Sequence, residues 1–308
     1  IDEEKPDIVV GDFRLSLSVS ARLRGIPYLS ICNTYWSPYA RVSYTIPEHP
    51  LTQILNVSVA DLLFRAVRPL AFAAHCAPLN NVRKRNGLHS LGLNLNRIYT
   101  DADHVLYADI ASLVRTVPLP DNHSFMGPVL WSAEHNYPAW WNELDAGTPV
   151  VYLTLGSSGS NDLLPIVLRA LRDLPIQIIV STAAQPNLPP SQPNAFCDDY
   201  LPGAAASERA RLVICNGGSL TTYQAFSYGV PVLGLPSNLD QHLNMMAVEE
   251  KGAGIRLRTE RAQGSEVRNA VCRLLEGTTF PTRAMAMRDE MQSMDSKGEF
   301  LKVLRSVC

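Results

Sequence analysis

The chain contains 308 residues, of which 46% are hydrophobic and 18% are charged, and its net charge is −2. This length is sufficient for two α/β domains with ordinary buried cores. The near-neutral charge and the lack of Lys/Arg runs argue against nucleic-acid binding and provide no attraction toward an anionic membrane surface. The six cysteines have no CxxC motif and no metal-ligand spacing, which is typical of reduced thiols in a cytoplasmic protein. We therefore expect a cytoplasmic location and no stable membrane insertion.

The N-terminal part of the sequence predicts a βαβ unit followed by a mostly helical segment. Two short apolar runs flank an amphipathic stretch, and the connection between two such strands is right-handed. Between residues 47 and 86, apolar residues recur at helical spacing, for which core packing is the default interpretation, and Pro69 is expected to end or kink the helix. The expected elements are strand 8–11, helix 15–24, strand 28–31, helical segment 47–86, and strands 97–100 and 104–107.

The beginning of the sequence suggests that its first domain is incomplete. The chain starts with Ile1 and enters a strand almost at once. The strands expected before residue 118 are too few for a doubly wound sheet of about six strands. We therefore expect that the first units of this domain are missing from the sequence.

The second half of the sequence predicts a parallel sheet. Residues 118–149 are rich in Pro, Asn, His and Trp without periodicity, which indicates a linker. Beyond it, apolar strands alternate with helices, a pattern typical of a sheet that is covered on both faces. The expected strands are 149–156, 177–181, 195–197, 212–215, 230–235 and 254–257, and the expected helices are 162–172, 220–228, 242–251 and 265–276. The predicted division is a domain at 1–127, a linker at 128–148, a domain at 149–280 and a helical tail at 281–308.

Residues 198–244 form the most informative segment. Strand 212–215 runs through Gly217 and Gly218 into a helix that begins with hydroxyl side chains, and a second buried strand precedes Asp240 and Gln241. The first-turn N–H groups of a helix lack intrahelical partners, and the helix dipole favours an anion at that end. Polar groups that follow the strands of an open α/β sheet gather outside the carboxyl ends of those strands. The segment therefore predicts a phosphate-binding corner.

This segment resembles the nucleotide-sugar signature of family 1 glycosyltransferases, which include macrolide and plant natural-product enzymes. The resemblance lies in NGGSLTTYQAFSYGVPVLGLPSNLDQ, while VVYLTLGSS and PDIVVGDF resemble a first donor-domain strand and a late acceptor-domain strand. It implies the GT-B fold, an α/β architecture of two Rossmann-like domains facing a cleft, here with an incomplete N-terminal acceptor-binding domain. It also implies inverting transfer from a UDP-sugar or TDP-sugar to a hydroxyl of a hydrophobic small molecule or lipid, with no metal and no cofactor.

The resemblance assigns donor-binding roles to individual residues. The turn and the first helical turn hold the diphosphate, and a loop of the first donor-domain strand touches it from the other side. An Asp-Gln pair grips the sugar hydroxyls, and an aromatic ring stacks on the uracil. The implied residues are Gly217, Gly218, Ser219 and Thr221 for the turn, Gly156 and Ser157 for the loop, Asp240 and Gln241 for the sugar, and Tyr200 and Pro202 for the base.

Three positions depart from the pattern of the family. Asn216 stands where a histidine usually bonds the diphosphate, and its amide can still donate to a phosphate oxygen. Gln224 stands where a glutamate usually holds the ribose hydroxyls. Asp12 matches the aspartate that orients the catalytic histidine, but the segment that carries this histidine is absent from the chain.

Simpler interpretations remain open for several of these residues. Gly217 and Gly218 could form only a tight connection, Asp12 could cap the helix that follows it, and Tyr200 could serve loop packing. His242 is expected to be a solvated or capping residue. The alternative function is a truncated nucleotide-sugar-binding module without transferase activity. A GT-B epimerase is a third possibility, but the acidic and histidine groups that it would need at the sugar are not found in the sequence.

Overall fold

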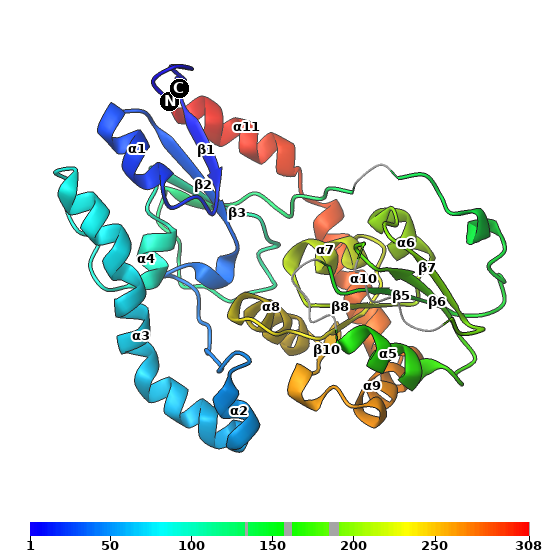
Figure 1. Cartoon of the computed structure of the whole chain (residues 1–308). Helices are drawn as coiled ribbons and strands as arrows, with labels where there is room; N and C mark the ends of the chain where they lie inside the picture. Colours follow the sequence, from blue (N-terminus) through cyan, green and yellow to red (C-terminus); the bar gives the residue numbers. More distant parts are fainter. Residues whose placement is uncertain (133–134, 157–161, 185–190, 308) are drawn as a thin grey trace. The chain divides into compact units, whose positions relative to one another are not determined.

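The computed structural model describes residues 1–132, 135–156, 162–184 and 191–307. The chain forms two compact units (Figure 1). The first comprises Ile1–Tyr44, Ser58–Val129 and Ser293–Cys308, and the second comprises Thr45–Val57 and Leu130–Gln292.

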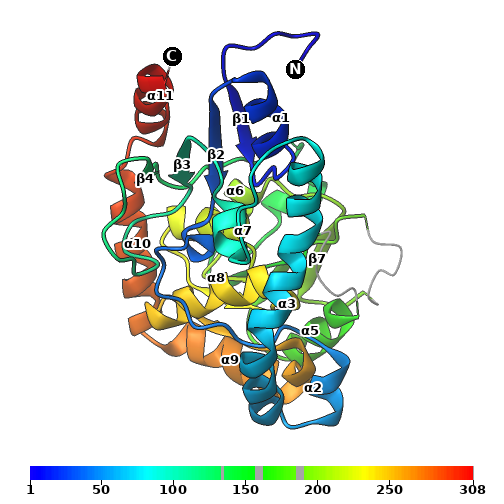
Figure 2. The ribbon, with the colours of Figure 1, turned by 90° about the vertical axis from the view of Figure 1, so that its left-hand side faces the viewer.

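The first unit contains a four-stranded parallel sheet with the order β1-β2-β3-β4. The C-terminal helix α11 lies beside this sheet in both views (Figure 1 and Figure 2), because Phe300 and Leu304 pack against the buried residues Leu29 and Leu106. Its strands are β1 (Val9–Asp12), β2 (Tyr28–Cys32), β3 (His104–Tyr107) and β4 (His123–Phe125). Its helices are α1 (Leu17–Arg24), η1 (Thr34–Trp36), α3 (Val57–Arg85), α4 (Leu95–Tyr99) and α11 (Ser296–Val307).

Two expectations for this unit are wrong. Residues expected as strand 97–100 belong to helix α4, because the Asn94 side chain accepts a hydrogen bond from the Arg97 N–H at 3.3 Å and caps the helix. The helical spacing of the buried Leu95 and Ile98 then places both against Cys76 of α3. The stretch 118–149, whose composition indicated a linker, contains strand β4, which is only three residues long and is specified by parallel pairing with β3 rather than by alternation.

Helix α3 also differs from the prediction. Pro69, which was expected to end or kink it, does not end it, because the helix continues through Pro69 and Pro78 to Arg85. The apolar residues at helical spacing on this helix do not pack in a core, since Leu62, Val67 and Leu70 are 69%, 56% and 74% exposed. Periodicity identified the helix, but it did not identify what the helix packs against.

The second unit contains the expected parallel sheet, which has the order β10-β9-β8-β5-β6-β7. Its core is aliphatic and includes Val151, Leu168 and Ile178. The strands are β5 (Val150–Thr154), β6 (Gln177–Ser181), β7 (Ala195–Asp198), β8 (Leu212–Cys215), β9 (Val232–Gly234) and β10 (Gly254–Arg256). The helices are α2 (Pro50–Ile54), η2 (Ala139–Asn142), α5 (Leu163–Leu171), α6 (Gly203–Arg209), α7 (Ser219–Ser227), α8 (Leu239–Glu250), η3 (Thr259–Arg261), α9 (Gly264–Glu276) and α10 (Thr279–Gln292).

The strand order of the second unit reverses at β5. The chain continues from β5 to β6 on one side, and β8 pairs with β5 on the other. Ligands of open α/β sheets bind outside the carboxyl ends of the strands at such a switch point. The topology therefore predicts a ligand site at the loops that follow β5 and β8.

Residues 45–57 group with the second unit, although the predicted domain 1–127 includes them. The Glu48 N–H donates to the Ser237 carbonyl at 3.1 Å, and the Arg258 guanidinium donates to the Ile46 carbonyl at 2.8 Å. This segment, which we call the strap (residues 45–57), therefore contacts the loop before α8 and the loop after β10.

Candidate functional site

The carboxyl edge of β5 and β8 brings two predicted donor-binding segments together. Thr154 of β5 lies opposite Cys215 of β8, so Gly156 and Asn216 follow neighbouring strands. A Cβ atom added to Gly156 would lie 3.4 Å from Asn216 Nδ2, which shows how closely the loop approaches the amide. Ser157 lies outside the described residues. The two sides of the predicted phosphate site therefore meet at the switch point.

The Gly-Gly corner has a backbone that other residues would not adopt easily. Gly217 has φ 82°, and a Cβ atom there would lie 2.5 Å from Met245 Cγ of α8. Asn216 is buried, and its Oδ1 accepts a hydrogen bond from the Gly218 N–H at 3.0 Å. Gly218 is the N-cap of α7, so the corner directs the chain from β8 into the helix. The positive end of the α7 dipole therefore lies at the same edge as Gly156.

A buried network of polar side chains holds the backbone of this corner in place. Asn244 Nδ2 donates to the Gly217 carbonyl at 2.8 Å and to Thr222 Oγ1 at 3.0 Å. Thr222 Oγ1 in turn donates to the Gly218 carbonyl at 2.9 Å. Sequence reasoning counted Thr222 among the hydroxyls at the start of the helix but did not identify Asn244, although Asn244 stands one helical turn after Gln241 and could have been recognised by that spacing. Ser219 and Thr221 occupy the first turn of α7, and both are half-buried.

The Asp-Gln pair lies in the first turn of α8, and Gln241 has a capping role. Gln241 Oε1 accepts hydrogen bonds from the Ser237 N–H at 2.9 Å and from the Asn238 N–H at 3.4 Å, while Asn238 Oδ1 accepts from the Gln241 N–H at 3.0 Å. This arrangement is a capping box. Gln241 is only 3% exposed, whereas Asp240 is half-buried. The glutamine oxygen therefore shapes the loop, and its contact with a sugar remains a prediction.

The residues predicted for the base and the ribose lie near one another. A Cβ atom on Gly203, which follows Pro202, would lie 2.8 Å from Gln224 Oε1. Gln224 Nε2 donates to the Trp131 carbonyl at 2.5 Å. The Tyr200 ring is 50% exposed and stacks on the His135 ring, with 5.4 Å between centroids and 19° between planes. An aromatic ring is therefore present at this position, with one face against an imidazole.

Asp12 ends strand β1 in the first unit. Its carboxylate is exposed and makes no hydrogen bond or ion pair with any described residue. Helix α1 begins at Leu17 with Ser16 as its N-cap, so the expectation that Asp12 could cap this helix is wrong. The chain places four residues between the strand end and the helix, which is beyond the reach of a cap. The following residue, Phe13, has φ 49°, a conformation that is uncommon for a non-glycine residue.

His242 is fully buried, which contradicts the expectation of a solvated or capping residue. It lies on the inner face of α8, where its Nδ1 is 3.4 Å from Arg256 Nη1 and its Nε2 has no partner among the described residues. Burial and the positive charges of Arg258 and Arg256 lower the pKa of His242 to about 3. The imidazole is therefore neutral at physiological pH, and it belongs to the interior of the unit.

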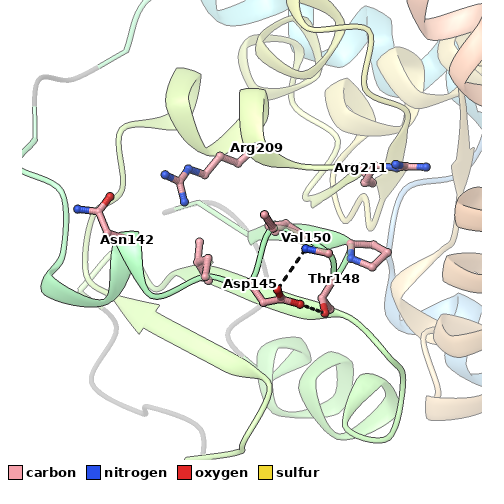
Figure 3. Close-up of a pocket in the computed structure, with 10 residues that line it drawn as sticks. Asn142, Asp145, Thr148, Val150, Arg209 and Arg211 are labelled. Carbon is pink, nitrogen blue, oxygen red and sulfur yellow. Dashed lines mark hydrogen bonds between the residues drawn. The ribbon is translucent and has the colours of Figure 1, made fainter.

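A cavity of about 420 Å³ lies at the opposite edge of the sheet (Figure 3). It is lined by residues around Val150, where β5 begins, and by Arg209 and Arg211, with Asp145 accepting from Thr148 Oγ1 at 2.6 Å. Since β5 and β8 are parallel, this cavity is separated by the length of the strands from the Gly-Gly corner. It is not the predicted phosphate site.

The described residues contain neither a metal-binding cluster nor a membrane-spanning helix. Among the described residues, no group of three His, Cys, Asp or Glu side chains is arranged to hold a metal ion. None of the helices in the described ranges combines the length and the apolar composition needed to span a bilayer.

Known proteins that resemble this chain in fold or in sequence are named glycosyltransferases. A family model described as "Erythromycin biosynthesis protein CIII-like, C-terminal domain" matches residues 166–307. The solved structure of Spinosyn Rhamnosyltransferase SpnG complexed with thymidine diphosphate aligns with a TM-score of 0.69 and 21% identity, over 99% of this chain and 74% of that one. The same enzyme has also been solved with the spinosyn aglycone. The fold is therefore the GT-B fold of the glycosyltransferases, as the sequence motifs implied.

The relatives define the family more narrowly. A "PGL/p-HBAD biosynthesis glycosyltransferase" of Mycobacterium tuberculosis (strain ATCC 25177 / H37Ra) is 52% identical over 289 residues, which are 94% of this chain and 68% of the relative. The chain belongs to this family of PGL/p-HBAD biosynthesis glycosyltransferases. A "PGL/p-HBAD biosynthesis rhamnosyltransferase" of Mycobacterium bovis (strain BCG / Pasteur 1173P2) is also 52% identical, and the chain spans 64% of its length. A relative from the same strain, named an "Inactive PGL/p-HBAD biosynthesis glycosyltransferase", is 53% identical over 171 residues.

Proposed function

We propose that this chain binds a nucleoside diphosphate sugar at the carboxyl edge of β5 and β8 and serves glycosyl transfer to a hydroxyl group. The observation that carries the proposal is the Gly-Gly corner, where Asn216, Gly217 and Gly218 lead into the N-terminus of α7 beside Gly156. Membership in a family of glycosyltransferases supports the same chemistry.

The corner suits the leaving group of this reaction. Cleavage of the bond between sugar and diphosphate places negative charge on the phosphate oxygens. Preorganised N–H donors and a helix dipole aimed at that charge stabilise the transition state, and loss of one such donor costs roughly 3–4 kcal/mol. Because the Asn244–Thr222 network already holds the corner, little reorganisation is needed when the charge develops. In this proposal no metal or cofactor takes part.

The site residues and the similar proteins together suggest the classes of donor and acceptor. Asp240 and Gln241 in the first turn of α8 would hold the sugar hydroxyls, and Tyr200 would stack on the base. The rhamnosyltransferase relative and the thymidine diphosphate complex of SpnG favour a deoxyhexose carried by TDP, with a UDP-sugar as the other candidate. A hydrophobic acceptor is favoured by the aglycone complex of SpnG.

Asp12 would contribute to the first step, in which the acceptor hydroxyl loses its proton. Its exposed carboxylate can orient an imidazole, which is the usual general base near neutral pH. In this proposal the imidazole comes from a histidine that this sequence does not contain.

A second candidate is a nucleotide-sugar-binding module without transferase activity. The observation that favours this candidate is a relative that is named an inactive glycosyltransferase. Both candidates share the donor site and differ only in turnover.

Isothermal titration of the chain with TDP and UDP tests the shared part. Saturable binding with a preference for one nucleotide is expected, and a lack of saturation at millimolar concentration of both nucleotides would overturn both candidates. Release of TDP from a TDP-sugar in the presence of a hydrophobic alcohol would then favour the transferase, whereas binding without release would favour the module.

A further inference from the structure

A cavity of about 380 Å³ lies in the first unit. It opens between the middle of α3 and the N-terminus of α4. Its walls are mostly apolar or aromatic, with one cationic group among them. The residues that matter for its chemistry are Tyr44, Arg68, Phe72, Leu93, Leu95 and Asn96.

Arg68 is the unusual member of this group. Its guanidinium carbon lies 4.5 Å from the centroid of the Tyr44 ring and 5.8 Å from that of Phe72. It is half-buried, and it makes no ion pair or hydrogen bond with any residue in the described ranges. Other arginines of α3 differ, since Arg65 pairs with Asp61 at 2.9 Å and Arg83 pairs with Asp101 at 2.8 Å. The cation of Arg68 is therefore held by ring faces and has no counterion.

Stacking leaves the donors of this guanidinium available. An arginine that lies on an aromatic ring uses its face, while its five N–H groups point outward in the plane of the group. These donors form a fork that matches the oxygens of a carboxylate or a phosphate. Arg68 can therefore bind an anion without losing its contact with Tyr44.

The aromatic walls are fixed in place before any ligand binds. The Tyr44 hydroxyl donates to Asn96 Oδ1 at 3.1 Å, and Asn96 Nδ2 donates to the Ser37 carbonyl at 3.2 Å. Phe72 meets the Tyr44 ring edge-on, with 5.3 Å between centroids and 86° between planes. Phe72 also packs on the buried cluster of Cys76, Leu95 and Ile98. A preorganised site of this kind loses little conformational entropy on binding.

We propose that this cavity binds an apolar molecule that carries one anionic oxygen group, with the anion on Arg68 and the apolar part against Tyr44, Phe72 and Leu93. The assignment of this cavity as a subsite for the acceptor rests on the proposed function, whereas the binding itself does not. A carboxylate and a phosphate share the required chemistry. The test includes one ligand with each group.

Isothermal titration of the whole chain with octanoate, octyl phosphate and octanol isolates the anionic group on a constant apolar tail. Saturable binding of octanoate or octyl phosphate is expected, with at least about tenfold higher affinity than octanol. The Arg68→Gln variant should lose about tenfold in affinity for the anion that binds and none for octanol. Arg68→Lys, which keeps the charge without the fork, should lie between the two.

Control experiments distinguish failure of this inference from failure of the proposed donor site. Arg65→Gln changes a neighbouring arginine of the same helix that already has a partner, and it should bind the anions like the wild type. Equal affinity for octanol and both anions, or anion binding that is unchanged in Arg68→Gln, would overturn the inference. TDP titrated into the same samples should bind equally in every variant. Nucleotide binding without anion binding would reject the cavity alone, and anion binding without nucleotide binding would reject the proposed function alone.

Discussion

The hydroxyl of Thr52 donates a hydrogen bond to Oε1 of Glu260 at 2.6 Å and thereby joins residues that are 208 positions apart. Glu260 also accepts from Arg258 Nη2 at 2.8 Å, and Glu48 Oε1 accepts from the Thr259 N–H at 2.8 Å. These bonds attach the strap to the loop that follows β10. The same strap contacts Ser237, which precedes the Asp240–Gln241 pair, so its attachment supports the candidate donor site.

Replacement of Thr52 by Val should destabilise the second unit. The hydroxyl is 2.6 Å from a carboxylate oxygen, and the loss of a hydrogen bond to a charged group costs about 1.5–3 kcal/mol. Urea unfolding measures the change in free energy. The exposed Thr282, whose hydroxyl bonds only to the Thr278 carbonyl, provides the control, and Thr282→Val should change stability by less than about 0.5 kcal/mol. Equal losses in the two variants would contradict the role of Thr52.

The strap should be held less strongly at alkaline pH. Burial and a hydrogen bond with Glu260 raise the pKa of Glu48 from 4.5 to about 8. For Glu260, burial acts in the opposite direction, but bonds from Arg258 and Thr52 dominate and lower the pKa to about 2. Between pH 4.5 and 8 the folded state therefore holds a proton on Glu48 that the unfolded chain releases. The free energy of unfolding falls as pH rises through this window.

The Glu48→Gln variant tests this pH dependence. A glutamine mimics the protonated carboxyl, since its oxygen can accept from Thr259 and its amide can donate to Glu260. The variant and the wild type should be equally stable below pH 4.5, and the variant should be the more stable at pH 8. Urea midpoints at several pH values measure the difference. The exposed Glu266→Gln should keep the wild-type profile, and a constant difference between Glu48→Gln and wild type would refute the assignment.

Replacement of Gly217 by Ala should disrupt the corner. An alanine at φ 82° is strained by about 1–3 kcal/mol, and its Cβ would lie 2.5 Å from Met245 Cγ. We expect lower stability and loss of TDP binding, measured by urea unfolding and calorimetry. Gly264→Ala is a matched control, since Gly264 begins α9 and its nearest atom would be 3.9 Å away. Normal TDP affinity in Gly217→Ala would show that the corner does not hold the phosphates.

Substitutions at Asp240 and Gln241 should weaken binding of the sugar more than binding of the nucleotide. Asp240→Asn removes the charge. It is expected to lower the affinity for a TDP-sugar by about tenfold and to leave the affinity for TDP unchanged. Gln241→Ala should also weaken the TDP-sugar more than TDP, but it removes a capping box as well and should cost about 1 kcal/mol of stability. Titration of each variant with both ligands gives the ratio. If Asp240→Asn lowers the affinity for TDP and for the TDP-sugar by the same factor, Asp240 does not contact the sugar.

The amino-acid sequence was sufficient to predict the parallel sheet of the second unit and the position of its Gly-Gly corner. Apolar runs such as 212–215 are long enough to indicate buried strands, and a Gly-Gly pair between strand and helix has few conformations. Strands 149–156 and 212–215 were predicted, with Gly156 at the end of the first and Asn216 directly after the second. These features depend on local patterns, and local patterns are visible in the sequence.

Other features were decided only by tertiary contacts. The attachment of the strap, the burial of His242 and the stacking of Arg68 on Tyr44 depend on residues that are distant in the chain and lie side by side only in the folded protein. Strand β4 has only three residues and is defined by its partner, and the exposed apolar residues of α3 have the same periodicity as a core helix. Hydrophobic spacing specifies which face of an element is apolar. Whether that face, or a charge beside it, finds a partner is settled by packing between segments that no sequence window contains.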